Sequence, residues 1–97
     1  MLTWVIYDIT EDRLRKKISD KCLDLGLQRI QYSVFLGDLN QNDRDVMKIF
    51  AQTKLEDKEE DRVYIFPMCR EDFKRVELIG QEFDKKLVAD ELSTKTF

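Results

Sequence analysis

Residues 3–10 begin with an apolar run that Asp8 interrupts, and strand geometry predicts where this carboxylate points. The stretch is rich in β-branched and aromatic residues, which favours a short strand that ends near Asp8. Side chains of a strand alternate between its faces, so Trp4, Ile6 and Asp8 are expected on one face. A carboxylate there must be paired, bound to a metal or placed where water reaches it. Two interpretations stay open: Asp8 opens the next turn, or it is a metal or catalytic ligand.

A helical period follows this strand. Thr10 is expected to be the N-cap and Gly26 to end the helix. Basic residues crowd its first turns, and they indicate either a solvated helix face or a surface for phosphate oxygens. The predicted inward stripe consists of Leu14, Ile18, Cys22 and Leu25, and the basic cluster of Arg13, Arg15, Lys16 and Lys17.

Residues 27–36 read as one long strand with two unlike faces, ended by Gly37. One face is apolar, and the other is polar apart from Phe35. An aromatic ring on the second face is expected only if that face meets a partner or a ligand. The apolar face consists of Ile30, Tyr32, Val34 and Leu36, and the other of Arg29, Gln31, Ser33 and Phe35.

A second helix is expected after Asn40, its predicted N-cap, with a solvated charged loop at residues 54–61. Residues 62–68 are apolar at alternate and adjacent positions, which predicts a central strand buried on both faces. A turn at residues 71–73 and a fourth short strand at residues 75–79 complete the pattern. The inward stripe predicted for the second helix consists of Val46, Ile49, Phe50 and Thr53.

This order of elements predicts an α+β fold, the ferredoxin-like β-α-β-β-α-β sandwich, whose antiparallel sheet carries its helices on one face. The expected domain is residues 1–80, and residues 81–97 form a C-terminal tail or an arm that orders against a partner subunit. Exposed Trp4, Ile6 and Phe35 on the helix-free face would make an apolar patch, which predicts a homodimer. That dimer would bring two copies of Asp8 together.

Composition narrows the chemistry. The 97 residues suit one domain, and the formal charge of −3 means that nucleic acid would have to meet a local basic patch. The chain has no histidine, which removes imidazole acid–base schemes and favours an oxygen-bound Mg²⁺ or Mn²⁺ over zinc. Cys22 and Cys69 are expected to be free thiols in a reducing compartment. No stretch suits a membrane span, so no membrane partner is expected and the cytoplasm is the expected location.

Several runs, in this order and spacing, resemble the CRISPR-associated Cas-two family, small dimers of the spacer-acquisition machinery. The run at residues 26–35 is the most telling of them. The runs are YDI at 7–9, GLQRIQYSVF at 26–35, GDL at 37–39, VYIFP at 63–67 and VELIG at 76–80.

The resemblance implies a ferredoxin-like homodimer that works with a Cas-one type integrase on double-stranded DNA, with single-stranded RNA as a second candidate substrate. It also implies magnesium-dependent endonuclease activity in some members. The family's metal aspartate falls on Asp8. Lys17 and Leu36 depart from an arginine and a glutamate seen in relatives. The implied catalytic residues are Asp8, Arg15, Arg29 and Phe35, and the implied nucleic-acid-binding residues are Arg13, Arg15, Lys16, Lys17 and Arg29.

Three functions follow as hypotheses. The first is a metal-dependent phosphodiesterase built on Asp8. The second is a non-catalytic adaptor that holds duplex DNA through its phosphates while the integrase does the chemistry. The third is a ferredoxin-like regulatory domain that binds a metabolite, for which the sequence offers no glycine-rich ligand loop.

Overall fold

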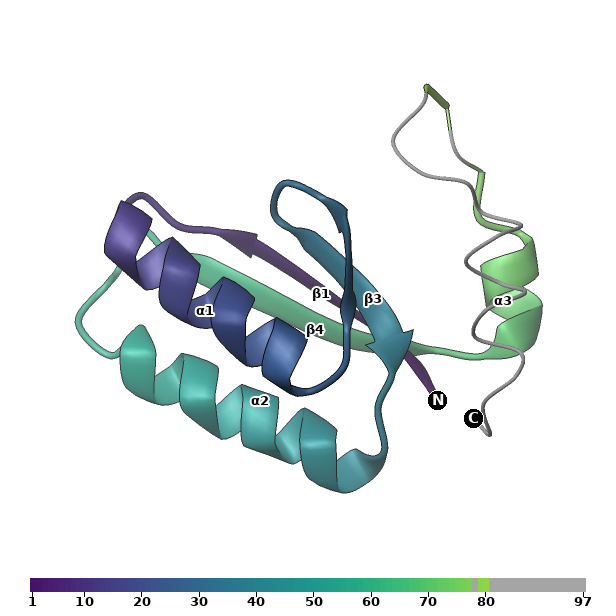
Figure 1. Cartoon of the computed structure of the whole chain (residues 1–97), viewed down its shortest axis with the longest axis horizontal. Helices are drawn as coiled ribbons and strands as arrows, with labels where there is room; N and C mark the ends of the chain where they lie inside the picture. The colour runs from purple at the N-terminus through teal and green to yellow at the C-terminus, as the bar shows by residue number, and fades with distance from the viewer. Residues whose placement is uncertain (78, 81–97) are drawn as a thin grey trace.

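The computed structural model describes residues 1–77, 79 and 80, and these residues form an antiparallel sheet with two long helices on one face (Figure 1). The strand order β2-β3-β1-β4 confirms the predicted ferredoxin-like α+β fold. The elements are β1 (Leu2–Asp8), α1 (Asp12–Asp24), β2 (Gln28–Gln31), β3 (Val34–Asp38), α2 (Gln41–Lys54), β4 (Arg62–Met68) and α3 (Arg70–Lys74).

Strand β1 is buried on both of its faces. Toward α1 and α2, which we call the helix side, Val5 and Tyr7 belong to the larger core cluster. On the opposite, helix-free side, Trp4 packs with Phe73 of α3 in a second cluster. Each face of the strand therefore has its own apolar partners. The prediction that Trp4 is exposed on the helix-free face is wrong, because its side chain is buried there.

The predicted long strand at residues 27–36 is wrong, because the chain turns back at Tyr32 and Ser33 to form the β2–β3 hairpin. The pairing also shifts between Arg29 and Gln31, as a β-bulge does. Phe35 consequently pairs with Val5 on the helix side and is fully buried, not exposed on the helix-free side.

Gly37 lies within β3 and does not end a strand. A Cβ atom at this position would come within 2.8 Å of Leu27 Cδ2 and 3.1 Å of Leu27 Cα. The glycine is therefore required by the close packing of the segment that leads into β2 against β3.

Strand β4 is an edge strand of the described sheet, whereas the sequence predicted a central strand. It pairs with β1 alone, and Tyr64 and Phe66 are 49% and 37% exposed. The sequence pattern is apolar on both faces of β4, but within the described residues neither face of this strand is fully covered. The uncovered rings are the apolar surface that a partner could bury.

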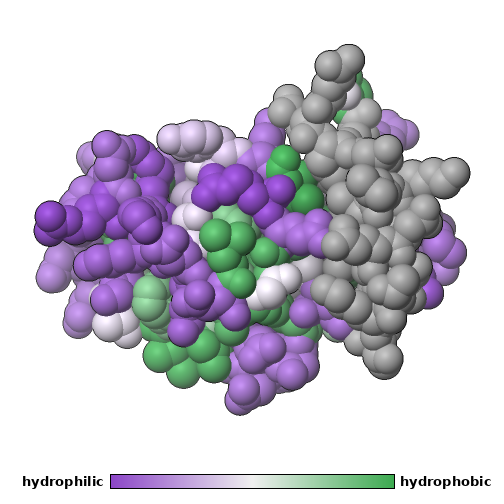
Figure 2. Space-filling view, viewed as in Figure 1, coloured by the Kyte–Doolittle hydropathy of each residue, from purple (hydrophilic) through white to green (hydrophobic). Residues whose placement is uncertain are grey.

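The buried stripe of α2 is displaced by one residue from its predicted position. Met47 and Ala51 are buried, whereas Ile49 and Thr53 are exposed. Figure 2 shows mostly polar side chains on this side of the molecule, with an apolar area over α2, where Ile49 is 61% exposed. Apolar residues occupy both possible stripes, so the pattern alone could not decide between them.

The end of the described chain also differs from the prediction. A short helix, α3, replaces the predicted turn at residues 71–73, and its Phe73 is buried against the helix-free side of the sheet. The described residues of the range 75–79 form no strand. The predicted arm at residues 81–97 lies outside the described residues.

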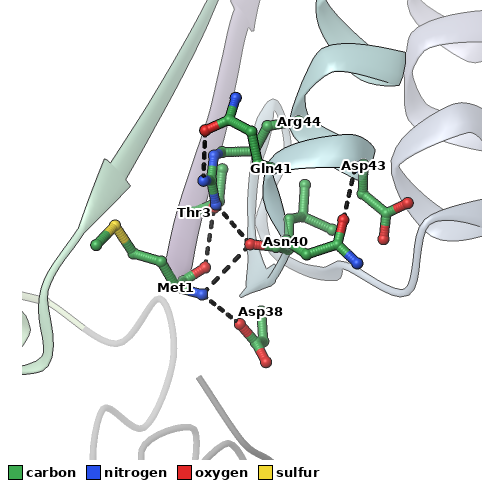
Figure 3. A network of polar contacts seen from close by, with 8 residues as sticks. Met1, Thr3, Asp38, Asn40, Gln41, Asp43 and Arg44 are labelled. Carbon is green, nitrogen blue, oxygen red and sulfur yellow. Dashed lines mark hydrogen bonds and ion pairs between the residues drawn. The ribbon is translucent and has the colours of Figure 1, made fainter.

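Polar contacts join the start of β1 to the end of β3 (Figure 3). The amino group of Met1 donates to Asp38 Oδ1 at 2.7 Å. Asn40 caps α2 as predicted, since its side-chain oxygen accepts a hydrogen bond from the backbone N–H of Asp43 at 2.8 Å. The connection between β3 and α2 is therefore fixed at both ends.

None of the helices in the described part of the chain is long and apolar enough to cross a membrane.

We predict that Phe35→Ala lowers the free energy of unfolding by about 3–5 kcal/mol, because it opens a cavity in the helix-side core. Phe66→Ala, at a partly exposed ring, should cost less. Urea denaturation of both variants compares them, and Phe35→Leu provides a milder change if the alanine variant does not fold. Equal losses at the two positions would contradict the placement of Phe35 in the core.

Candidate functional site

Asp8 ends β1 as an exposed carboxylate on the helix-free side, as predicted. Across the β1–β4 pair it faces Arg62. The pKa of Arg62 is raised, first by its hydrogen bond with Tyr64 and then by charge interactions with Tyr64 and Asp8. A carboxylate and a guanidinium therefore lie side by side at the solvent-exposed end of the sheet.

Asp8 does not belong to a ready-made cluster of metal ligands. Among the described residues, no group of three or more Asp, Glu, Cys or His side chains is placed to hold a metal ion. Mg²⁺ in proteins that act on phosphates is commonly held by one or two carboxylates together with waters and substrate oxygens. The donor chemistry of Asp8 suits that ion.

The turn after Asp8 is held from two directions. The backbone N–H and the hydroxyl of Thr10 donate to Asp61 Oδ1, at 3.1 and 2.8 Å. Arg15 donates to the carbonyl oxygens of Ile9 and Thr10, at 2.7 and 2.9 Å, and pairs with Asp12. The position of Asp8 therefore depends on a clamp made by α1 and by the loop before β4.

Two predictions for this region are wrong. Thr10 is not the N-cap of α1, because Glu11 occupies that position and makes no side-chain capping bond. The loop at residues 54–61 is not merely solvated, because Asp61 holds Thr10 and Lys58 pairs with Glu11 at 3.3 Å.

The basic cluster of α1 divides into two kinds of residue. Arg15 is half-buried and occupied by the clamp, and Lys16 pairs with Asp20 at 2.9 Å. Arg13 and Lys17 are exposed and form no ion pair within the described residues. Of the four cations, these two have charges left for a partner.

Arg29 and Phe35 lie on the helix side, away from the face that displays Asp8. The Arg29 guanidinium lies 4.9 Å from the centre of the Phe35 ring and donates to the carbonyl oxygen of Tyr32 at 2.7 Å. It also donates to Ser19 Oγ of α1. The predicted set of site residues is thus divided between two sides of the sheet, and the buried ring of Phe35 can act only through Arg29.

Two titratable groups are buried close to Arg29. Burial raises the pKa of the Cys22 thiol to about 12, although the Arg29 charge acts in the opposite direction. Burial also raises the pKa of Tyr7, again against the Arg29 charge. Both groups therefore stay protonated at neutral pH, and neither acts as an anionic nucleophile there.

Four residues of this region were not predicted as site residues: Ser19, Asp61, Arg62 and Tyr64. The β1–β4 register brings Arg62 beside Asp8, and the fold brings Asp61 to Thr10 across 51 positions of the sequence. No local pattern could reveal such contacts. The one available signal was that Arg62 opens an apolar strand, so that it had to lie near one end of the sheet.

The family model described as "CRISPR associated protein Cas2" matches residues 1–76. A "CRISPR-associated endoribonuclease Cas2" of Desulforudis audaxviator is 39% identical over 75 residues, covering 76% of this chain and 69% of the relative. A protein of the same description from Korarchaeum cryptofilum is 41% identical over 78 residues, covering 79% and 82%.

Solved structures agree with these matches. The crystal structure of Streptococcus pyogenes Cas2 at pH 6.5 superposes with a TM-score of 0.66 and 25% identity, covering 82% of this chain and 100% of that one. A hypothetical protein of Thermus thermophilus superposes with a TM-score of 0.67 and 30% identity, covering 81% and 89%.

We predict that a thiol-alkylating reagent modifies Cys69 but not Cys22 in the folded protein at pH 8, because Cys69 is exposed and Cys22 is buried with a raised pKa. Mass spectrometry should find one added group, and two after denaturation. Cys69→Ser should abolish the labelling of the folded protein. Rapid native labelling of Cys22 would show that the core beneath Arg29 is open.

Proposed function

Because the chain belongs to the Cas2 family of CRISPR-associated proteins, we propose that it acts in CRISPR spacer acquisition as a homodimer. In this proposal the dimer holds duplex DNA for a Cas-one type integrase, and it cleaves RNA or DNA as a metal-dependent endonuclease. The observation that carries the proposal is the exposed carboxylate of Asp8, which precedes a turn held by hydrogen bonds from Arg15 and to Asp61.

The exposed rings of β4 support the homodimer. Tyr64 and Phe66 are paired with Ile6 and Trp4 of β1, so all four side chains belong to the helix-free side. Burial of partly exposed aromatic rings against a second copy would be favourable. A two-fold axis near the Asp8 end of β1 would also bring two carboxylates together.

The nuclease part of the proposal rests on relatives named endoribonucleases and on the chemistry of Asp8. The two Asp8 carboxylates of a dimer would hold Mg²⁺, with Mn²⁺ as an alternative. Such an ion would polarise the phosphate group and lower the pKa of a water bound to it. Arg62, beside Asp8, is placed to contact a phosphate oxygen, and Arg15 keeps the turn in position through its two carbonyl contacts.

The scaffold part of the proposal rests on Arg13 and Lys17, which are exposed on a regular helix and form no ion pair within the described residues. Cations on a rigid element bind backbone phosphates without reading sequence. Cleavage and scaffolding use different residues of the chain, so substitutions can separate them.

We predict that Asp8→Asn abolishes Mg²⁺-dependent cleavage of RNA or DNA, because it removes the charge that holds the cation. The exposed side chain has no packing role, so the melting temperature should stay unchanged. Asp57→Asn, at an exposed aspartate of the loop before β4, is the matched control. Cleavage of labelled single-stranded RNA and duplex DNA is measured with Mg²⁺ and with excess chelator, and full cleavage by Asp8→Asn would contradict the assignment.

We predict that the double charge reversal Arg13→Glu and Lys17→Glu weakens duplex DNA binding and lowers the number of new spacers inserted in cells. The slope of log affinity against log salt should become shallower, because fewer counterions are released. Lys48→Glu with Lys54→Glu makes the same change in net charge on α2 and serves as the control. Equal losses from both pairs would show that total charge, not the α1 surface, determines binding.

A further inference from the structure

A cavity of about 480 Å³ lies on the helix side, between α1 and the β2–β3 hairpin. Tyr7 and Ser19 line its buried part, Arg29 and Arg15 contribute cations, and Tyr32 lines it from the hairpin turn. Asp8 is not among its lining residues. The cavity is therefore a separate feature of the molecule from the metal-binding position proposed above.

The buried part of the cavity is polar. Tyr7 and Ser19 are 5% and 7% exposed, and their hydroxyl groups share a hydrogen bond. Ser19 also accepts a hydrogen bond from Arg29. Because the pKa of Tyr7 is raised by burial, its hydroxyl keeps its proton at neutral pH and remains a donor.

Arg29 gives the cavity a positive charge that is not paired with a carboxylate of the described residues. Asp12 and Asp20 also line the cavity, but they are paired with Arg15 and Lys16. Arg29 forms no ion pair within the described residues, and its two named hydrogen bonds leave further N–H groups available. A guanidinium fixed over an aromatic ring with donors remaining is well suited to a phosphate group.

Tyr32 adds an aromatic surface beside this cation. Its side chain is 77% exposed, and its ring is not part of either core cluster. Its carbonyl oxygen is held by Arg29 at 2.7 Å, so the ring and the guanidinium come from adjoining positions. Packing within the protein accounts for the buried hydroxyl groups of Tyr7 and Ser19, but not for the exposed ring of Tyr32 at the mouth of the cavity.

We propose that this cavity binds one nucleotide unit of a single strand, with the phosphate on Arg29 and the base stacked on Tyr32. Proteins that bind unpaired nucleotides combine these two contacts: aromatic stacking for the base and cations for the backbone. The inference rests on the proposed function, because it takes the ligand to be nucleic acid. It adds the place where an unpaired nucleotide is held, on the opposite side of the sheet from Asp8.

Arg15 connects the cavity to the turn that presents Asp8. The same side chain lines the cavity and donates to the carbonyl oxygens of Ile9 and Thr10. The side chain of Arg15 would thus lie between a nucleotide in the cavity and that turn. The strand would run from the cavity past α1 toward the Asp8 end of β1.

Calorimetric titration in excess chelator tests the site without any contribution from a metal. The probes are uridine monophosphate, uridine and inorganic phosphate, and we expect the monophosphate to bind more tightly than either fragment. Tyr32→Ala should weaken its binding about tenfold or more, the usual effect of losing one base stack. Ile49→Ala shortens an exposed apolar side chain of α2 that does not line this cavity, and it should leave the affinity unchanged.

Three further measurements separate the possible results. Asp8→Asn protein, which we expect not to cleave, is titrated with 5′-phosphorylated and 5′-hydroxyl RNA tetranucleotides, to distinguish a free mononucleotide from a strand end. Melting temperatures show whether Tyr32→Ala remains folded, and Arg29→Lys tests the planar phosphate contact.

Loss of affinity with Tyr32→Ala but not with Ile49→Ala supports the site, whichever nucleic acid the protein cleaves or holds. If no probe binds, or if both variants behave alike, the inference is overturned. Metal-dependent cleavage by the native protein would in that case still support the proposed function. If the protein binds nucleotides but neither cleaves nucleic acid nor binds duplex DNA, the result supports the cavity as a binding site and refutes the proposed function.

Discussion

Burial of β1 from both sides is the constraint on which the placement of the functional residues depends. Val5 and Tyr7 pack against the helix-side core, and Tyr7 stacks on Phe35 with ring centres 6.2 Å apart. On the other side Trp4 contacts the rings of Phe66 and Phe73, each with centres 6.3 Å apart. A shift of the pairing by one residue would exchange these faces at a large cost in burial, so the direction of Asp8 is fixed by the aromatic residues behind it.

The sequence was sufficient for the overall fold because the strongest local signals agree with it. The β-branched start of β1, the apolar stripe of α1 and the cap at Asn40 all predict elements that the structure contains. The hairpin was missed because no Gly, Pro, Asn or Asp marks the turn at Tyr32 and Ser33, and the apolar alternation continues across them. One contact that stabilises this turn is long-range: the carbonyl oxygen of Ser33 accepts a hydrogen bond from the backbone N–H of Tyr7 at 3.1 Å.

The predicted site differs from the observed arrangement because both sides of the sheet carry an apolar cluster, and the sequence did not show which one meets the helices. Arg29 and Phe35 share a face, as predicted, but that face is the helix side, and the predicted open-face aromatic is a core residue. Asp8 was placed correctly because β1 is continuous and its alternation is uninterrupted. Asp61 and Arg62 could not be predicted, since their relation to β1 exists only after β4 has paired with it.

The division of the site between two sides of a sheet makes the turn after Asp8 the structural connection between them. Arg15 serves this connection in a way that a lysine could not, because its planar fork reaches two carbonyl oxygens and the Asp12 carboxylate together. A single ammonium group on a flexible stem would hold one of these partners well and leave the turn less ordered. The identity of residue 15 therefore matters for geometry as much as for charge, whereas Arg13 and Lys17 are exposed and make no ion pair within the described residues that would require one cation or the other.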